Sequence, residues 1–408
     1  MLHWIKHTLG KKNLLLMGVQ GFYWCAWCCY FSFLVLYLQN HGYSNVQCAQ
    51  TQVFIAIATL VAQPFIGYLT DTYVTCKKYL LVTCALAIPV AFLLQMTVAN
   101  PILCYAAIIL QALLFYPTAS IIDSWTMALK ETDPQVQYPV TRSAGSVLYS
   151  ITALVFGNVI AALGDGIIAP SFVIFAVLMF LCVLFLEETP CSNKGSRKDS
   201  SAHAEDRISG VEAVKLLMKN RIYVFFILSC LFYNLANKAT GCFISNYVAD
   251  IGGDSGGIGL LLFFSALVEF PAMMFMGKFI KRYSLNNLHL VALSGVVIKN
   301  LFFFLASSMP LLVIGQIAQG LSYGCYVYIY LEFLHKHTPK QLSVTAITLG
   351  SALSGSLGGI VGNYLAGVVL DTMGLSALSI IFTVVAAAGI LAFLPIAFSK
   401  KEAPAANK

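Results

Sequence analysis

The chain has 408 residues, of which 59% are hydrophobic and only 10% charged, and its mean hydropathy is +0.81. Soluble domains carry about 25% charged residues because their surface faces water, so this composition excludes an ordinary soluble globule. The net charge of +7 does not indicate nucleic-acid binding, because the basic residues are spread over short loops between apolar runs. We therefore predict a membrane protein with no nucleic-acid partner.

Twelve apolar runs follow one another along the chain, each long enough for a helix of about 20 residues to cross the hydrocarbon. The runs are continuous rather than alternating, and lipid offers no partner to a free backbone amide, so helices are expected instead of a barrel. The expected fold class is an all-α transmembrane bundle of about twelve helices in a 6+6 arrangement. The runs lie near residues 13–39, 48–70, 79–97, 101–128, 139–164, 168–187, 221–249, 257–278, 287–307, 309–334, 341–370 and 375–398.

The longest polar segment separates the first six runs from the last six. It begins EETPCSNKGSRKDSSAHAEDR, a composition typical of a solvated linker, and its last part, ISGVEAVKLLMKN, could form a short interfacial helix. We expect an N-terminal half at 1–187, a cytoplasmic linker at 188–220, a C-terminal half at 221–400 and a tail at 401–408.

Among the loops, lysine and arginine occur only in alternate ones. The intervening loops, NHGYSNVQ, TVANP, GDGIIAP, DIGGDSGG, ASSMP and DTMGLS, contain neither residue. Because basic loops stay on the cytoplasmic side, both termini and the linker are predicted to be cytoplasmic, in a multi-pass protein of the cell (inner or plasma) membrane.

Two kinds of internal pattern concern the packing of the halves. The segment PFIGYLTDTY after the second run matches MFMGKFIKRY after the eighth at its Phe, Gly and Tyr, with a constant offset. This repeat is typical of transporters whose parallel halves rock around a central site. The eleventh run contains glycines four apart, at 355 and 359 and at 358 and 362, a spacing that permits close helix packing.

The segment AQPFIGYLTDTYVTCKKYLL resembles the loop between helices two and three of the major facilitator superfamily, whose signature is G-x-x-x-D-R/K-x-G-R/K-R/K. Gly67, Asp71, Lys77 and Lys78 fit it, while Thr and Val replace its first basic residue and second glycine. The flanking residues are similar to the lactose permease-like, oligosaccharide:proton symporter branch. The resemblance implies a gating role for the four residues, with Gly67 allowing close helix approach. The alternative interpretation is that Asp71, Lys77 and Lys78 are loop charges that only determine the orientation of the helices in the membrane.

A second resemblance lies in the fourth and fifth runs. IIDSW followed by QYPVTRSAGSVLY resembles the sugar-symporter arrangement of an acid on helix four and R-x-x-G on helix five. The resemblance implies that Asp123 and Arg142 bind sugar hydroxyls and that Tyr149 stacks on the pyranose face.

The second half resembles the same branch in part. Glu269 lies where lactose permease carries a sugar-contacting glutamate, and Lys299 where it carries an arginine tied to proton coupling. Two acids of helix seven are replaced by Asn234 and Asn237, which are retained as substrate-binding candidates. The histidine and glutamate of helix ten are absent, which weakens the inference of proton coupling.

Charges inside apolar spans indicate either static pairs or a water-filled site, because an isolated charge costs about 2.5–3.5 kcal/mol at the bilayer centre. Asp123–Arg142 and Glu269–Lys299 could be static pairs that lock helices together. The alternative is a polar site between the halves, in which Glu269 or Asp123 carries the proton and Lys299 modulates it.

The sequence thus predicts a secondary active transporter for proton-coupled uptake of a sugar or oligosaccharide by alternating access, functional as a monomer in the bilayer. The alternatives are a symporter for a nucleoside or small aromatic acid and, with less support, drug efflux. No metalloprotease, paired-aspartate or nucleotide-binding motif is present. We therefore expect no enzyme activity, catalytic residue, cofactor or metal, and only a small polar solute and H⁺ as partners.

Overall fold

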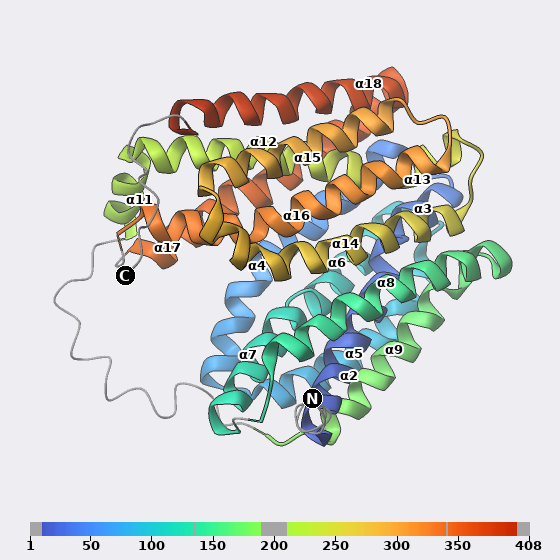
Figure 1. Ribbon diagram of the computed structural model, residues 1–408. Coiled ribbons are helices and arrows are strands. Elements are labelled where there is room, and N and C mark those ends of the chain that lie inside the picture. Colours follow the sequence, from blue (N-terminus) through green and yellow to red (C-terminus); the bar gives the residue numbers. More distant parts are fainter. Residues whose placement is uncertain (1–9, 134, 189–209, 340–341, 398–408) are drawn as a thin grey trace. The chain divides into compact units, whose positions relative to one another are not determined.

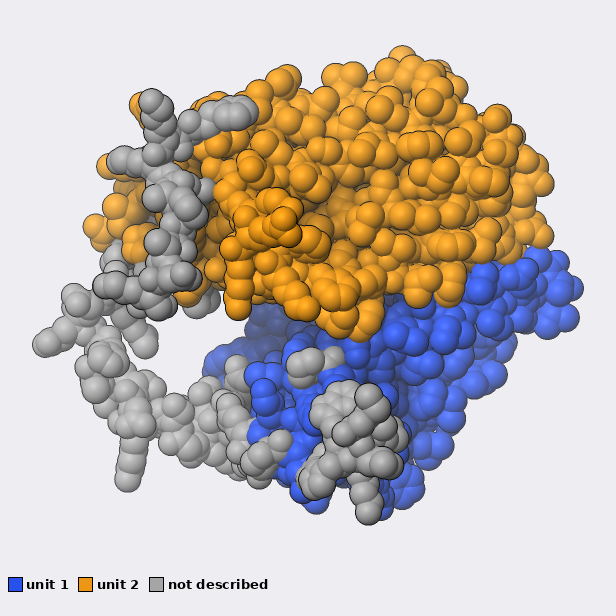
Figure 2. Space-filling view, in the orientation of Figure 1, with its two compact units in different colours: residues 1–43, 54–206 blue, residues 44–53, 207–408 orange. Residues whose placement is uncertain are grey.

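The structure is a computed structural model that describes residues 10–133, 135–188, 210–339 and 342–397, nearly all of them helical (Figure 1). The chain forms two compact units, residues 1–43 with 54–206 and residues 44–53 with 207–408 (Figure 2). The unit boundary at 206 and 207 falls inside the segment expected to be the linker. Residues 189–209 of that segment and the tail 401–408 lie outside the described residues.

Unit 1 holds the helices of the first six apolar runs. Short breaks divide two of these runs: Phe33 follows a π-helical stretch in the first, and Tyr116 and Pro117 interrupt the fourth. The elements are α2 (Lys11–Trp27), the π-helix η1 (Cys28–Ser32), α3 (Leu34–Asn40), α4 (Asn45–Thr72), α5 (Cys76–Thr97), α6 (Pro101–Phe115), α7 (Thr118–Thr132), α8 (Tyr138–Leu163), η2 (Asp165–Ile167) and α9 (Ile168–Leu184).

Unit 2 holds the helices of the last six runs, preceded by a helix at the end of the expected linker. Gly374 has a φ of 84°, a left-handed conformation that glycine adopts without strain, and it divides α18 into the two runs predicted there. The elements are α11 (Gly210–Lys219), α12 (Arg221–Cys242), α13 (Ile244–Asp250), α14 (Ser255–Arg282), α15 (Leu285–Phe304), α16 (Met309–His337), α17 (Ser343–Gly350), the π-helix η4 (Ser351–Ser356) and α18 (Leu357–Ala397).

The described helices account for about ten to twelve membrane crossings. Ten segments are long and apolar enough to span, and the last of them, Thr345–Ala397, contains the break at Gly374. Helix α16 has 29 residues but a more polar sequence with several Gln, Gly and Tyr residues, so it does not stand out by hydropathy. The all-helical transmembrane fold class is therefore confirmed.

The sequence repeat corresponds to a repeat of helices. Helices α4 and α14 occupy equivalent positions in the two sets of six, and each has 28 residues. Their first residues are separated along the chain by the same number of positions as the matching residues of the sequence repeat. Each carries an internal proline, Pro64 in α4 and Pro271 in α14. The repeat that three matching residues indicated therefore extends over whole helices.

The first nine residues of α4, 45–53, belong to unit 2, although the rest of this helix belongs to unit 1. The Asp371 carboxylate accepts hydrogen bonds from Asn45 Nδ2 at 2.7 Å and from the backbone N–H of Val46 at 2.9 Å. A carboxylate is favourable at a helix N-terminus because the first N–H groups lack partners within the helix. A Cβ at Gly367 would lie 2.6 Å from Ala49 Cβ, so this glycine permits the close contact.

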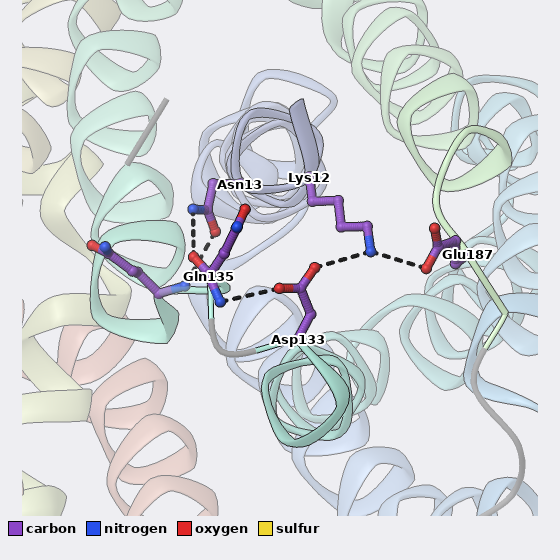
Figure 3. Close-up of polar contacts among 6 residues, drawn as sticks. Lys12, Asn13, Asp133, Gln135 and Glu187 are labelled. Carbon is purple, nitrogen blue, oxygen red and sulfur yellow. Dashed lines mark hydrogen bonds and ion pairs between the residues drawn. The ribbon is translucent and has the colours of Figure 1, made fainter. Parts of the chain in front are cut away.

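One end of unit 1 is held by a polar cluster around Lys12, at the start of α2 (Figure 3). Its Nζ lies 3.0 Å from both Asp133 Oδ2, after α7, and Glu187 Oε2, after α9. Asn13 donates to the carbonyl of Gln135 at 2.9 Å. The hydrogen bond from Lys12, and a second from the backbone N–H of Gln135, lower the pKa of Asp133. Three chain segments are thereby joined at one point.

The four glycines predicted in the eleventh run, which lie in η4 and α18, divide into a packed pair and an open pair. A Cβ at Gly358 would lie 3.1 Å from the Leu231 carbonyl oxygen, and one at Gly362 would lie 2.5 Å from the Leu235 carbonyl oxygen. Helix α12 therefore lies directly against these two positions. At Gly355 and Gly359 a Cβ would meet only side-chain atoms at 3.8 and 3.9 Å, so only one of the two predicted glycine pairs is used for close packing.

This difference predicts opposite effects of one methyl group on the same helix. Gly362→Ala should lower stability by about 1–3 kcal/mol, because the backbones of α12 and α18 must separate. Gly359→Ala should be neutral or slightly stabilising, because alanine favours the helix. Thermal unfolding in detergent measures both variants. Equal midpoints for the two would show that the close contact does not contribute to stability.

Candidate functional site

The three predicted residues of unit 1 lie together. Arg142 Nε on α8 lies 4.0 Å from Asp123 Oδ1 on α7, and the side chains are 36% and 35% exposed respectively. Tyr149 follows Arg142 by seven residues and so lies on the same face of α8, two turns away. The expected acid–guanidinium pair is present, and both groups remain accessible.

Helix α2 contributes two polar or aromatic side chains to this pair. Gln20 Nε2 donates to Asp123 Oδ1 at 2.6 Å, and the Arg142 Cζ lies 5.2 Å from the centroid of the Trp24 ring. The second contact is a cation–π interaction. Gln20 and Trp24 were not among the predicted site residues; the signal for Gln20 is an amide in an otherwise apolar run.

Tyr149 lies among aromatic rings of α2. Its ring centroid is 6.4 Å from that of Trp24 and 6.2 Å from that of Trp27, and its hydroxyl lies 3.1 Å from Ser32 Oγ in η1. A Cβ at Gly145 would lie 2.5 Å from Trp24 Cδ1. The glycine of the R-x-x-G segment therefore makes room for the indole that contacts Arg142.

We call these side chains the unit 1 cluster; they are Gln20, Trp24, Trp27, Asp123, Arg142 and Tyr149. An ion pair with its atoms 4.0 Å apart and a third of each side chain exposed contributes only about 0–1 kcal/mol to stability, so it is a poor lock. The cluster offers a carboxylate that accepts, a guanidinium that donates and flat rings. Within the described ranges, no three His, Cys, Asp or Glu residues are grouped as metal ligands would be.

In unit 2, Asn234 and Asn237 lie one turn apart on α12 and are both buried. Asn234 Nδ2 donates to the Tyr326 hydroxyl and to the Cys230 carbonyl, both at 2.9 Å. The Tyr326 ring is stacked on Tyr233, with centroids 4.2 Å apart and 13° between the planes. Tyr326 was not among the predicted site residues.

The predicted pair of Glu269 and Lys299 is not among the ion pairs of the described residues. Lys299 is 1% exposed, and its Nζ donates to the carbonyl oxygen of Asn237 at 3.3 Å and to its Oδ1 at 3.2 Å. The reason is geometric: α15 presents Lys299 to two oxygens of α12. The partners of this amine are therefore two amide oxygens and not a carboxylate.

Glu269 is half-buried on α14, and Lys238 on α12 is a residue of opposite charge. Helix α16 approaches the backbone of α14 at this point, because a Cβ at Gly324 would lie 2.8 Å from the Glu269 carbonyl oxygen. We call Asn234, Asn237, Lys238, Glu269, Lys299 and Tyr326 the unit 2 cluster.

The predicted gating lysines hold the end of α9. Lys77 Nζ donates to the carbonyls of Leu184 and Leu186 at 3.0 and 2.6 Å, where a helix C-terminus favours a cation. Lys78 Nζ lies 3.5 Å from Glu188 Oε1. The pKa of Glu188 is lowered first by a hydrogen bond from the Thr75 hydroxyl and further by Lys78.

The other two gating candidates are less informative. A Cβ at Gly67 would meet no atom within 4 Å, so the expected close helix approach is not seen there. Asp71 lies in the last turns of α4, and its side chain lies outside the described part of the structure. The gating role of all four residues stays a prediction.

A membrane-spanning helical bundle with two six-run units and charged clusters on its helices is the architecture of a solute transporter. The chain belongs to the MFS_1 like family, whose model matches residues 14–381. It is therefore a multi-pass secondary transporter of the major facilitator superfamily and not an enzyme. The crystal structure of the nucleoside transporter NupG has the same fold, with a TM-score of 0.81 at 16% identity over 96% of this chain and 100% of that chain.

Two curated relatives are similar over most of their length. The putative nucleoside transporter YegT of Escherichia coli (strain K12) is 25% identical over 89% of this chain and 84% of its own. The maltose permease of Geobacillus stearothermophilus is 24% identical over 91% of each chain. These relatives imply a small solute as substrate and differ in which solute they name.

The unit 1 cluster predicts that Arg142 cannot be replaced by another cation. Arg142→Lys should weaken substrate binding at least tenfold while the protein still inserts, because an ammonium lacks the planar fork of donors. Binding to purified protein is the measurement, and Arg221→Lys, at an exposed position, is the matched control. Unchanged affinity in Arg142→Lys would remove this residue from the site.

The unit 2 cluster predicts that Asn237 and Lys299 are energetically coupled. Asn237→Leu should cost about 1.5–3 kcal/mol, because a buried ammonium loses a charge-assisted hydrogen bond. Adding Lys299→Met should recover much of this loss, because the uncompensated charge is then gone. Thermal unfolding of both single variants and the double variant gives the coupling energy. Additive effects would contradict the pairing.

Proposed function

We propose that this transporter takes up nucleosides, solutes that join a hydroxyl-bearing ring to a flat heterocyclic base. Both clusters are proposed to contact the substrate during the transport cycle. The observation that supports this best is the pair of buried amides of Asn234 and Asn237, each of which keeps one function without a hydrogen bond among the described residues.

The unit 1 cluster suits a solute with hydroxyls and a flat face. Hydroxyl groups both donate and accept, so the carboxylate of Asp123 and the guanidinium of Arg142 complement them. The indoles and the phenol offer apolar faces for stacking. These features suit a sugar as well as a nucleoside, and alone they do not separate the two.

The amides of the unit 2 cluster favour the nucleoside. Asparagine presents a donor and an acceptor side by side, which matches the edge of a nucleobase. Among described residues, Asn234 Oδ1 and Asn237 Nδ2 make no hydrogen bond, so each amide retains one free function. The lactose permease-like branch has two acids at these positions, which suit sugar hydroxyls better.

An oligosaccharide is the second candidate. It is favoured by the likeness of IIDSW and R-x-x-G to the sugar-symporter pattern, and the maltose permease is one of the relatives. The amides of α12 could also bind sugar hydroxyls, but an oligosaccharide does not require a donor and an acceptor side by side.

We further propose that Glu269 carries the coupling proton. A mid-span carboxylate is costly when ionised and dry, so the proton offsets this cost when the site closes. Lys238 supplies the opposing charge while Glu269 is ionised. Transport would then be driven inward by a proton gradient.

The substrate is tested by reconstituting the chain in vesicles and measuring uptake of radiolabelled uridine, maltose and a hydroxybenzoate, with and without an inward proton gradient. Uridine is expected to accumulate, and the gradient is expected to increase its accumulation. Vesicles containing Arg142→Lys protein serve as the matched control. Accumulation of maltose without uridine would replace the first candidate with the second.

Glu269→Gln is predicted to abolish accumulation driven by the proton gradient, because glutamine cannot bind and release the proton. Exchange of labelled for unlabelled substrate should continue, since the amide still forms hydrogen bonds. Counterflow and gradient-driven uptake in the same vesicles separate the two activities. Full accumulation by this variant would transfer the role to Asp123, and gradient-independent transport by the parent would mean that no proton is used.

A further inference from the structure

We propose that α11 lies on the membrane surface and binds anionic phospholipid headgroups through Lys215, Lys219 and Arg221. The exposed apolar side chains of α11, such as Val214 and Met218, would enter the boundary between headgroups and acyl chains. This inference concerns the segment before α12 and is independent of the transported solute.

Chain connectivity places α11 beside the point where α12 enters the membrane. Helix α11 ends at Lys219, and α12, which is a membrane-spanning candidate, begins at Arg221. Only Asn220 separates them, and its side chain accepts from the backbone N–H groups of Ile222 and Tyr223. A ten-residue helix is about 15 Å long, so no part of α11 lies far from the end of the span.

The corner at Asn220 is fixed to the rest of unit 2. Asn220 Nδ2 donates to the His337 carbonyl at the end of α16, at 3.2 Å. Leu217 is 1% exposed and anchors α11, which packs against α12 and α17. The helix is therefore held in place by the protein and presents a defined outer surface.

That outer surface is amphipathic. Val214 and Met218, one turn apart, are 37% and 50% exposed. Lys215 and Lys219 are also one turn apart and exposed on the adjoining side of the helix. Exposed apolar side chains next to lysines are the arrangement by which interfacial helices bind anionic membranes.

Charge favours a lipid headgroup over an apolar protein partner. Lys215, Lys219 and Arg221 are all exposed, and Glu212 is the only acidic residue of α11. The last turn of α16, which the Asn220 hydrogen bond holds at the same corner, contributes further basic residues. Basic clusters next to a span attract anionic lipids in this way.

The test uses the full chain with Met218→Trp, reconstituted in vesicles of phosphatidylcholine alone or mixed with phosphatidylglycerol. Lipids brominated on their acyl chains should quench the introduced indole, measured as the difference from the parent protein. Quenching should be stronger in the mixed vesicles. Val214→Trp, one turn away, is a second probe if the first variant does not fold.

Two matched variants separate the parts of the proposal. Glu212→Trp, at a position one turn from both Lys215 and Leu216, should show weaker acyl-chain quenching than Met218→Trp. In the Met218→Trp background, Lys215→Gln with Lys219→Gln should abolish the difference between the two vesicle types. If Met218→Trp with both lysines intact is quenched equally with and without phosphatidylglycerol, α11 does not bind the anionic headgroups. An indole shielded from both brominated lipid and aqueous iodide would indicate a protein partner and overturn the proposal.

Discussion

Every backbone amide inside the hydrocarbon of a membrane must be bonded within the protein, because no water is present to replace a lost partner. The chain meets this constraint with nearly continuous helices, and the departures from regular α-helix are few and local. Two of them are the π-helical stretches η1 and η4. The first contains Ser32, which contacts Tyr149, and the second packs against α12, which carries Asn234 and Asn237. The irregular backbone therefore lies beside both candidate clusters, where π-bulges are frequent.

The basic residue of each cluster has a different environment. Arg142 is partly exposed, lies over an indole and has a carboxylate 4.0 Å away. Lys299 is enclosed and contacts the two oxygens of one asparagine. The guanidinium can therefore exchange its partner for a solute at little cost, whereas the ammonium cannot leave its partner without losing stability. This contrast favours Arg142 over Lys299 as the proposed binding group.

The sequence was sufficient for the helices and for the pair in unit 1. Apolar runs of the right length predicted the spans, because hydrocarbon selects strongly on composition, and the spacing of Asp123 and Arg142 followed a recognisable pattern. The partner of Lys299 could not be predicted, because it depends on how α12 and α15 are rotated about their axes. The contacts of Gln20 with Asp123 and of Trp24 with Arg142 could not be predicted for a related reason. The sequence of an apolar run does not show which face of the helix packs against other helices and which face contacts charged side chains.

The capping of α4 by Asp371 has a consequence for biogenesis. The bonded residues are 326 and 325 positions apart along the chain. The helix is synthesised early, yet the carboxylate that caps its first turn emerges only when almost the whole polypeptide has been made. Until then the Val46 N–H must donate to water or to another acceptor. This helix end therefore acquires its final hydrogen bonds late, although it belongs to one of the first segments to be inserted. A chain that stops before residue 371 could insert its early helices and still leave this end unfinished, which gives the cell a structural difference between a complete and an incomplete product.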